Sequence, residues 1–294
     1  MTSSLHHTLN EDFELFGWEY FETPNSSVRT WYSIAYETFI FSGGEVHIKI
    51  KGESCEKVRI NCRIKNSNDL MRLILAVDAL RGMGVKYIEA FIPYIPYARQ
   101  DRRMVEGEPL SIKVFANILN SLKLDKVICY DAHSEVSTVL IDNIEHHYNF
   151  KEVKQFITDL KQEDLTIVCP DLGAYKKIYK MCEYLGYNGQ IVTASKIRNV
   201  STGEILSTQI NLEGITLFET KCIVVDDLCE GGATFLGLAK ALKEKGASDL
   251  YLFVSHGIFS KGYDELMKYY TIIGTTNSFN KEYPKDIKVI NLEY

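Results

Sequence analysis

The fold is decided by the stretch KCIVVDDLCEGGAT at residues 221–234. Its first half is a short apolar run with β-branched residues, which predicts a buried strand. Two adjacent acids, Asp226 and Asp227, follow this run, and a Gly-Gly turn then leads into a stretch of helical periodicity. This order of strand, turn and helix is typical of a parallel α/β unit, in which ligands collect at the carboxyl ends of the strands.

The same alternation extends on both sides of this stretch, from about residue 45 to the end of the chain. It runs once to about residue 150 and starts again near residue 163. We therefore predict an α/β fold with two similar halves, a first domain at 1–150 and a second at 151–294. The first 40 residues are aromatic and irregular, and they give no clear assignment.

The individual elements follow from the hydrophobic periodicity and from the residues that can begin or end a helix. The predicted strands are 45–50, 57–64, 86–93, 126–130, 165–169, 221–225 and 250–254. The predicted helices are 69–82, which Asn68 caps, and 109–122, 152–161, 174–185, 234–245 and 261–269.

The composition is that of an ordinary globular protein, with 46% hydrophobic and 24% charged residues among 294. A net charge of −6 argues against a broad basic face for nucleic acid. No apolar run approaches the ~18 residues that cross a membrane, and the N-terminus does not resemble a secretion signal, so a cytoplasmic protein is expected. The seven cysteines contain no CxxC pair, which favours buried reduced thiols.

The acidic pair and the turn after it predict a sugar-phosphate site. Adjacent carboxylates at the end of a buried strand are costly unless they bind hydroxyls, a metal or cations. The small residues of Glu230–Thr234, at the start of a helix, let backbone N–H groups approach a phosphate. A capped turn with solvated acids would be the simpler interpretation for one acid, but two acids followed by GGAT favour the site.

Other strand ends repeat this pattern. The run CPDLGAYKK at 169–177 has an acid, Asp171, then a glycine turn, a helix start and two lysines. The run DAHS at 131–134 places His133 after an acid, as a candidate ligand for a metal or phosphate. His256, after the strand at 250–254, is a candidate for lining the cleft of the second half. The pair His146-His147 is predicted to lie on the surface.

Two further runs carry positive charge. The run PYIPYARQDRR at 93–103 concentrates three arginines beside tyrosines and prolines, which predicts a shaped anion-binding loop, because guanidinium forks match phosphate oxygens. The run SKIR at 195–198 contains Lys196 and Arg198 and is a candidate loop that brings charge to a transition state. The chain has no P-loop motif, so any ATP is bound in another way.

Taken together and in this order, the motifs resemble the ribose-phosphate pyrophosphokinases, also called phosphoribosyl pyrophosphate synthetases. The match extends from FIFSGGEVHIKI at 39–50 to SHGIFS at 255–260, and the first 38 residues do not resemble the usual opening of the family. The resemblance implies two phosphoribosyltransferase-like (type I) domains, each a mainly parallel sheet flanked by helices, with the active site between them. It also implies Mg²⁺-dependent transfer of the β,γ-diphosphate of ATP to the anomeric hydroxyl of a ribose, with release of AMP.

The resemblance also assigns roles to residues. Lys196 and Arg198 would stabilise the charge on the moving diphosphate, and His133 and Asp171 would hold magnesium. Asp226 and Asp227 would bind the ribose hydroxyls. ATP would be held by Arg99, Gln100, Asp101 and Arg102. Its adenine would be contacted by Phe41 and Glu45 of a neighbouring subunit. The 5-phosphate would lie on Glu230, Gly231, Gly232, Ala233 and Thr234. The family assembles as dimers built into hexamers, so a homo-oligomer is expected.

The phosphate loop departs from the family pattern, which is Asp-Thr-Gly-Gly-Thr. With Glu230-Gly231-Gly232-Ala233-Thr234 in its place the loop lacks one hydroxyl donor, and a terminal phosphate near −2 needs more donors than an esterified one. This favours an acceptor whose 5-phosphate continues into a larger group, such as ADP-ribose. Compact phage members of the family are associated with transfer to ADP-ribose in rebuilding NAD⁺, and this sequence resembles that type. Ribose 5-phosphate, held by backbone donors and Thr234, remains the alternative.

Two more departures are less direct. Gly43 replaces the acid of the F-x-D-G-E segment, which affects the adenine contact. Ala174 replaces the second glycine of the D-x-G-G turn, and it would be strained if that position required a positive φ.

Two other functions compete with diphosphate transfer. A phosphoribosyltransferase would consume an activated sugar instead of making it, and the arginine loop at 93–103 argues against it. A non-catalytic regulatory homologue would only assemble, and the intact His133, Asp171, Lys196 and Arg198 argue against that.

Overall fold

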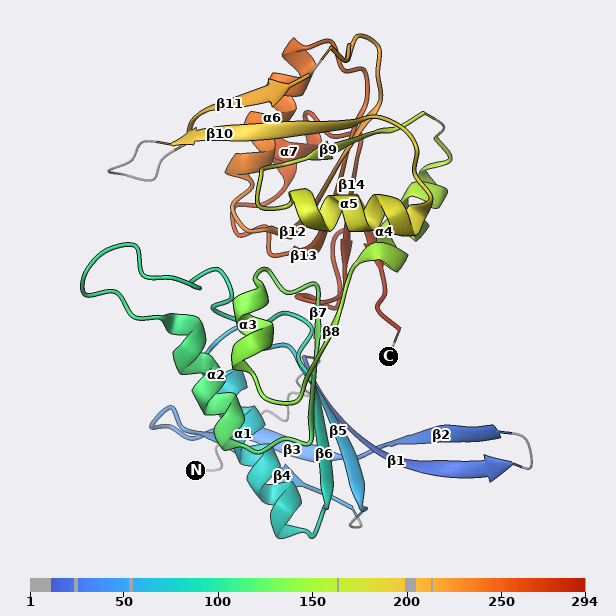
Figure 1. The fold of residues 1–294 in the computed structure, drawn as a ribbon. Coiled ribbons are helices and arrows are strands. Elements are labelled where there is room, and N and C mark those ends of the chain that lie inside the picture. Colours follow the sequence, from blue (N-terminus) through green and yellow to red (C-terminus); the bar gives the residue numbers. More distant parts are fainter. Residues whose placement is uncertain are drawn as a thin grey trace. The chain divides into compact units, whose positions relative to one another are not determined.

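In the computed structural model the chain forms two compact units, residues 1–147 and 148–294 (Figure 1). The structure describes residues 12–23, 26–52, 55–162, 164–198, 205–212 and 214–293. The predicted domain boundary, after residue 150, lies three residues beyond the division between the units.

The first unit contains a six-stranded sheet in the order β2-β1-β5-β6-β7-β8. Four strands are parallel, and β1 runs antiparallel to both of its neighbours, β2 and β5. The bounds of the strands are β1 (Phe13–Thr23), β2 (Ser26–Ser33), β5 (Lys57–Cys62), β6 (Tyr87–Phe91), β7 (Lys126–Tyr130) and β8 (Ile144–His147).

Three helices connect the parallel strands of this unit. They are α1 (Ser67–Gly82), α2 (Ser111–Ser121) and α3 (Glu135–Leu140). Each crossover joins adjacent strands in the same direction, and right-handed crossovers of this kind place every helix on the same face. Figure 1 shows the three helices on one side of the sheet, and residues of all three share one core with the strands.

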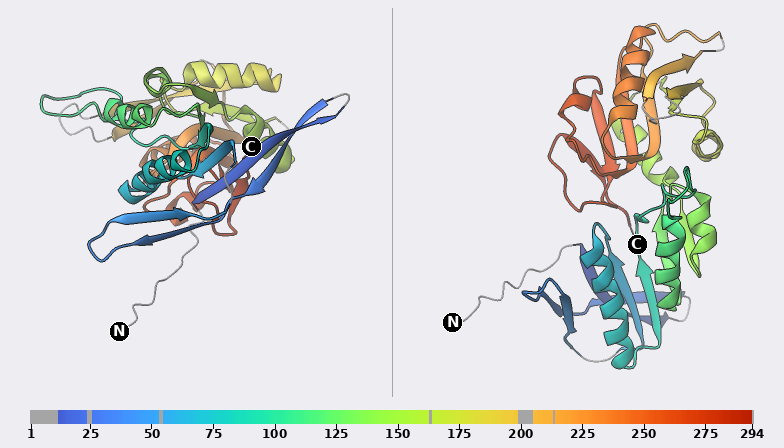
Figure 2. Two further views of the ribbon diagram at one scale, coloured as in Figure 1. Left: turned by 90° about the horizontal axis from the view of Figure 1, so that it is seen from below. Right: turned by 90° about the vertical axis from the view of Figure 1, so that its left-hand side faces the viewer.

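The β1–β2 hairpin forms one edge of this sheet and reaches beyond the parallel strands (Figures 1 and 2). Glu89 on β6 is 1% exposed, and its Oε1 accepts hydrogen bonds from Arg59 Nε at 2.5 Å and from Arg29 Nη1 at 3.2 Å. The Arg29 guanidinium lies 3.9 Å from the Trp18 ring centre, and that of Arg59 lies 4.4 Å from Trp31. Ion pairs and cation–π contacts therefore link the hairpin to β5 and β6.

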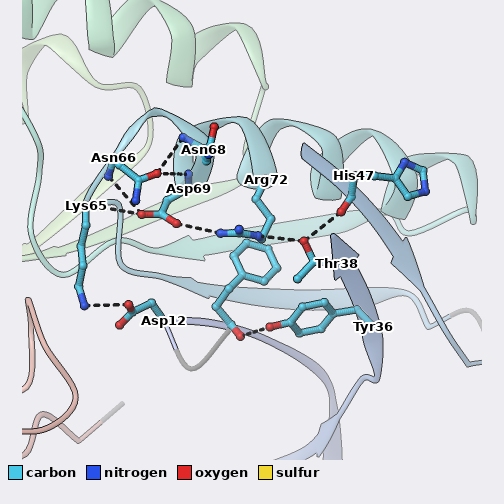
Figure 3. A network of polar contacts seen from close by, with 10 residues as sticks. Asp12, Tyr36, Thr38, His47, Lys65, Asn66, Asn68, Asp69 and Arg72 are labelled. Atoms are coloured by element: carbon cyan, nitrogen blue, oxygen red, sulfur yellow. Dashed lines mark hydrogen bonds and ion pairs between the residues drawn. The ribbon is translucent and has the colours of Figure 1, made fainter. Parts of the chain in front are cut away.

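A second, separate hairpin packs on α1. It consists of β3 (Tyr36–Ile40) and β4 (Val46–Ile50). The side chain of Arg72, which lies on α1, donates to Thr38 Oγ1 at 3.2 Å and pairs with Asp69 Oδ1 at 2.8 Å (Figure 3). Thr38 in turn donates to the carbonyl of His47 at 2.9 Å. This buried chain of contacts fixes the hairpin against the helix.

The cap of α1 differs from the prediction. Asn66, not Asn68, is the N-cap: its side chain accepts hydrogen bonds from the backbone N–H groups of Asn68 and Asp69, and Asp69 accepts from the N–H of Asn66 (Figure 3). Because the third helical residue is the acid that returns this bond, the helix begins two residues earlier than its apolar periodicity indicates.

The second unit contains a seven-stranded sheet in the order β11-β10-β9-β12-β13-β14-β15. All neighbouring strands are parallel except β10 and β11, which pair antiparallel. The bounds are β9 (Thr166–Cys169), β10 (Ile191–Arg198), β11 (Ile205–Asn211), β12 (Cys222–Cys229), β13 (Leu250–Gly257), β14 (Ile272–Thr276) and β15 (Ile287–Ile290).

Helices cover both faces of this sheet. Residues of α4 (Phe150–Leu160) and α5 (Tyr175–Leu185) share one core, and those of α6 (Ala233–Glu244) and α7 (Asp264–Met267) share the other. From β9 the chain continues outward to β10, whereas from β12 it continues in the other direction to β13. The strand order thus reverses between β9 and β12, which is where a doubly wound sheet opens a ligand-binding crevice.

The predicted fold class is confirmed, with mainly parallel sheets flanked by helices. Each predicted strand and helix has an observed counterpart, although 261–269 forms only the four-residue α7. The elements that the periodicity did not predict are β1, β2, β3, β8, α3, β10, β11, β14 and β15.

All seven cysteines are free thiols, and six of them are buried, as predicted. Within the described ranges, no helix has the length and apolar character needed to cross a membrane.

The ion pairs of Glu89 give a test of how the hairpin is held. We expect Glu89→Gln to lower the free energy of unfolding by about 2–4 kcal/mol, because it leaves two arginines next to a buried site without a carboxylate. Urea denaturation measures the change. The control is Glu56→Gln, which removes the carboxylate of an exposed pair with Lys86 and should leave the midpoint unchanged. Equal effects of the two substitutions would contradict this account.

Candidate active site

The loop after β6 presents the predicted arginines on a fixed base. Ile95 and Ala98 are each 1% exposed and belong to the core of the first unit. Tyr97 between them has a φ of +63°, which is rare for a bulky residue, and its carbonyl accepts from the N–H of Gln100 at 2.9 Å. This turn leaves Arg99, Gln100 and Arg102 exposed, so the loop is shaped and its polar side chains face solvent.

The loops after β6 and β7 meet through Asp101. Its Oδ2 accepts a hydrogen bond from Ser134 Oγ at 2.7 Å, and its Oδ1 accepts one from Arg102 Nε at 3.2 Å. Burial alone would raise the pKa of the Asp101 carboxyl, but these hydrogen bonds and the charges of Arg102 and His133 hold the pKa below its ordinary value. The structure therefore brings Asp101 and Arg102 together with the exposed His133. Ser134 of the DAHS run, for which the sequence predicted no role, joins the two loops through this hydrogen bond.

The tip of the β3–β4 hairpin carries Phe41 and Glu45. The N–H of Phe41 donates to the carbonyl of Glu45 at 2.8 Å, which closes the turn. Phe41 is 49% exposed, and its ring lies 4.8 Å from that of Phe39 and 5.8 Å from that of His47. An exposed ring supported by two others can stack on a planar group such as a base. Gly44, and not Gly43, takes the positive φ of the turn.

In the second unit, the acids at the switch point lie close together. Asp226 and Asp227 are in the last part of β12, and Asp171 follows the adjacent β9. Asp227 is 8% exposed, and its N–H donates to Asp226 Oδ1 at 2.9 Å. Asp171 Oδ1 accepts from the N–H of Ala174 at 3.1 Å. The charge of the half-buried Lys177 on α5 acts on this group, and the specific role of Lys177 was not predicted from the sequence.

The electrostatics of this acidic group are unusual. Burial is the main cause that raises the pKa of Asp226 well above its ordinary value, and repulsion from Asp227 adds to it. Attraction to Lys177 acts in the opposite direction without cancelling the shift. Asp226 therefore holds its proton at a pH where an ordinary aspartate is ionised, and a protonated carboxyl can both donate to and accept from a sugar hydroxyl.

The turn after β12 leads directly into α6. Gly232, with a φ of +77°, is the N-cap residue, and a side chain at this position would be strained. No side chain in the described part of the chain caps this helix, and Ala233, its first residue, is exposed. The first N–H groups of α6 and the hydroxyl-bearing Thr234 are thus at the surface next to Glu230 and Gly231, an arrangement suited to an anion.

The predicted catalytic pair lies on β10, so Lys196 and Arg198 belong to a strand and not to the loop that the sequence predicted. The backbone of Lys196 and Arg198 forms the strand that pairs with β11, with an irregular register at Ile197 and Arg198. The side chains of Lys196 and Arg198 lie outside the described residues.

His133 and Asp171 are the predicted ligands of magnesium. Within the described ranges, no three His, Cys, Asp or Glu side chains form a metal cage. Mg²⁺ commonly binds one or two carboxylates and completes its shell with waters and substrate phosphates, so a cage is not required. Asp171 fits this role as an oxygen ligand next to the acidic pair, and His133 is exposed at the strand end beside the arginine loop.

Two histidines differ from their prediction. His256 is 1% exposed, and its Nδ1 lies 2.7 Å from Ser278 Oγ, so it is a buried structural residue and does not line an open cleft. His146 is half-buried on β8, and its Nε2 accepts from the N–H of Ala132 at 3.0 Å, which supports the DAHS loop. Ala174 has a φ of −77°, so its substitution for glycine causes no strain.

The protein is of the α/β class. At the switch point of a parallel sheet it has two acids followed by a glycine turn, which together form a candidate sugar-phosphate site. Comparison with known proteins is more specific. The family model described as the N-terminal domain of ribose phosphate pyrophosphokinase matches residues 32–122. A ribose-phosphate pyrophosphokinase of Vibrio cholerae is 31% identical over 229 residues, which cover 75% of this chain and 70% of the relative.

A second relative, the ribose-phosphate pyrophosphokinase of Thermosipho africanus, is 32% identical over 232 residues, covering 76% of this chain and 70% of its own. The crystal structure of phosphoribosylpyrophosphate synthetase from Mycobacterium smegmatis has the same fold, with a TM-score of 0.75 and 24% identity over 88% of this chain and 86% of that one. The chain therefore belongs to the ribose-phosphate pyrophosphokinase family and is a transferase of the diphosphokinase type.

The raised pKa of Asp226 predicts how stability depends on pH. The folded protein binds this proton more tightly than the unfolded chain, so the resulting stabilisation is present below about pH 4 and is lost as the pH rises through the raised pKa. Asparagine is neutral at every pH. Asp226→Asn should therefore gain at least about 1 kcal/mol relative to the wild type between pH 4 and pH 8.

Urea denaturation across this pH range measures that difference. Asp286→Asn, at an exposed aspartate of the same unit, is the control and should show the same pH dependence as the wild type. A constant difference between Asp226→Asn and the wild type at all pH values would contradict the assignment.

Proposed function

We propose that the protein transfers the β,γ-diphosphate of Mg²⁺-bound ATP to the anomeric hydroxyl of a ribose 5-phosphate moiety and releases AMP. The observation that carries the proposal is the placement of Asp226 and Asp227 at the switch point, directly before the phosphate-type loop Glu230–Thr234. Acids that can bind sugar hydroxyls and backbone donors that can bind a phosphate are thus joined in one short segment. The relatives named above as ribose-phosphate pyrophosphokinases support the same reaction.

The first unit would bind ATP. Arg99, Gln100 and Arg102 are exposed on the loop anchored by Ile95 and Ala98, and Asp101 joins them to the DAHS loop. Guanidinium groups would bind the phosphates, and Phe41 with Glu45 would contact adenine. In Figure 2 the hairpin tip lies apart from the loop at 93–103. Contacts of both with one ATP would therefore come from two copies of the chain, consistent with a homo-oligomer.

The second unit would bind the acceptor and supply charge to the reaction. Diphosphate transfer requires in-line positioning and neutralisation of phosphate oxygens, and little covalent chemistry from the protein. Asp226 and Asp227 would orient the ribose through its hydroxyls. Lys196 and Arg198 would neutralise the moving diphosphate. Asp171 in this unit, and His133 in the first, would each be a ligand of magnesium, which would polarise the phosphate oxygens.

Two acceptors fit the loop, ribose 5-phosphate and the ribose 5-phosphate moiety of ADP-ribose. ADP-ribose is favoured because the loop Glu230–Thr234 carries a single hydroxyl, that of Thr234, and an esterified phosphate needs fewer donors than a terminal one. Both are small cytoplasmic metabolites, and the proposal involves no nucleic acid or membrane.

The experiment is to incubate the protein with Mg²⁺ and ATP, together with ribose 5-phosphate, ADP-ribose or neither, and to quantify AMP. AMP formed with one or both acceptors, and not without them, supports the proposal. Turnover with ribose 5-phosphate alone would exclude the extended acceptor. A reaction that needs a nucleobase and not ATP would instead identify a phosphoribosyltransferase, and no reaction with either acceptor would favour the non-catalytic homologue.

Lys196 gives a second test. Lys196→Ala should reduce kcat by at least about 100-fold, because a charge directed at a transition state is worth several kcal/mol, with little effect on the urea midpoint. Lys240→Ala, at an exposed lysine of α6, is the control and should retain activity. Unchanged turnover of Lys196→Ala would remove Lys196 from the catalytic assignment.

A further inference from the structure

A tight turn after β13 lies against the proposed phosphate loop. The N–H of Phe259 donates to the carbonyl of Cys229 at 3.1 Å, and the N–H of Ser260 donates to that of Glu230 at 2.8 Å. The turn closes on itself through the N–H of Gly262, which donates to the carbonyl of Phe259 at 2.8 Å. The residues between Phe259 and Gly262 are therefore fixed relative to the segment that begins the loop.

This turn places Lys261 over Gly231. A methyl group added to Gly231 would lie 3.5 Å from Cδ and 3.6 Å from Cε of Lys261, so the aliphatic part of the lysine runs along the glycine. The side chain is exposed. Within the described part of the chain, its ammonium forms no ion pair. A positive charge that no protein carboxylate neutralises is thus held beside the loop.

The conformation of the turn is specific. Phe259 has a φ of +47° and Gly262 a φ of +74°. A phenylalanine rarely adopts this conformation, and here packing maintains it, since Phe259 is 8% exposed and its ring meets those of Tyr263 and Tyr283 edge-on. The helix predicted to start at residue 261 begins instead at Asp264, so Lys261 belongs to the turn and not to a helix.

The charges around the loop call for a cation at this position. A sugar phosphate carries a charge near −2 at neutral pH. The loop Glu230–Thr234 contains an acid and no basic residue, so its own side chains do not attract an anion. The N-terminus of α6 offsets only about half a charge. Lys177 acts on the acidic pair, and among the described residues of this unit Lys261 is a cation whose side chain lies along the loop.

We propose that Lys261 is a substrate-binding residue that pairs with the phosphate of the ribose acceptor and makes the enzyme selective for phosphorylated acceptors. The proposal rests on the proposed diphosphate transfer at the same site. Lys261 contributes to binding and not to the chemical step, because it lies along the loop for the 5-phosphate, at the opposite end of the ribose from the anomeric hydroxyl that reacts. Its flexible stem can serve the phosphate of ribose 5-phosphate or the diphosphate of ADP-ribose.

The test is Lys261→Met, which keeps the aliphatic stem and removes the charge. For whichever acceptor the wild type uses, we expect KM to rise at least ten-fold while kcat and the KM for ATP stay within about three-fold. Lys261→Arg should restore most of the acceptor affinity. The matched control is Lys245→Met, an exposed lysine at the other end of α6, which should leave all three constants unchanged. An unchanged acceptor KM in Lys261→Met would overturn the proposal.

A binding measurement separates this proposal from the proposed function. Titration calorimetry with ribose 5-phosphate and with ADP-ribose, in the absence of ATP, needs no turnover. Tight binding to the wild type and at least ten-fold weaker binding to Lys261→Met would support the role of Lys261 even if no AMP were formed. Equal binding to both proteins, or no binding of either compound to the wild type, would overturn it.

Discussion

Repulsion between Asp226 and Asp227 at the end of β12 is the constraint on which the site depends. Two carboxylates on adjacent residues of a buried strand end cannot both ionise without cost, and burial raises the pKa of Asp226 well above its ordinary value. This arrangement destabilises the ligand-free protein at neutral pH, and sugar hydroxyls or a cation can relieve it. Proteins tolerate such a cost at functional sites, where binding provides the compensation.

The rest of the second unit is arranged around this pair. Reversal of strand order between β9 and β12 brings Asp171 beside it, and the turn at Gly232 directs the N–H groups of α6 to the same edge. The β13 turn then adds a lysine to a loop whose own side chains are neutral or negative. In the first unit the loops at the strand ends carry positive charge instead of negative charge. They present exposed arginines, and the contacts of Asp101 with Arg102 and Ser134 hold these loops in place.

The fold could be predicted where each parallel strand is a short apolar run followed by an acid, as in β9 and β12. The structure could not be predicted where a particular contact partner, and not the local sequence pattern, determines the conformation. The β1–β2 hairpin is held by arginines on tryptophans and on Glu89, and no local periodicity reveals these contacts. Asn66 and Asn68 are equally good caps by residue type, and only the position of Asp69 selects between them. Lys261 was assigned to a helix because the left-handed turn at Phe259 has no sequence signal.

In the proposed reaction both terminal phosphates of ATP move together to a ribose hydroxyl. Phosphorus NMR of a reaction containing Mg²⁺, ATP and the acceptor tests this most directly, because it identifies every phosphorus-containing product. Diphosphate transfer predicts AMP and a new diphosphate ester on the anomeric carbon in equal amounts, without ADP. Formation of ADP with a singly phosphorylated sugar, or of inorganic phosphate alone, would contradict it.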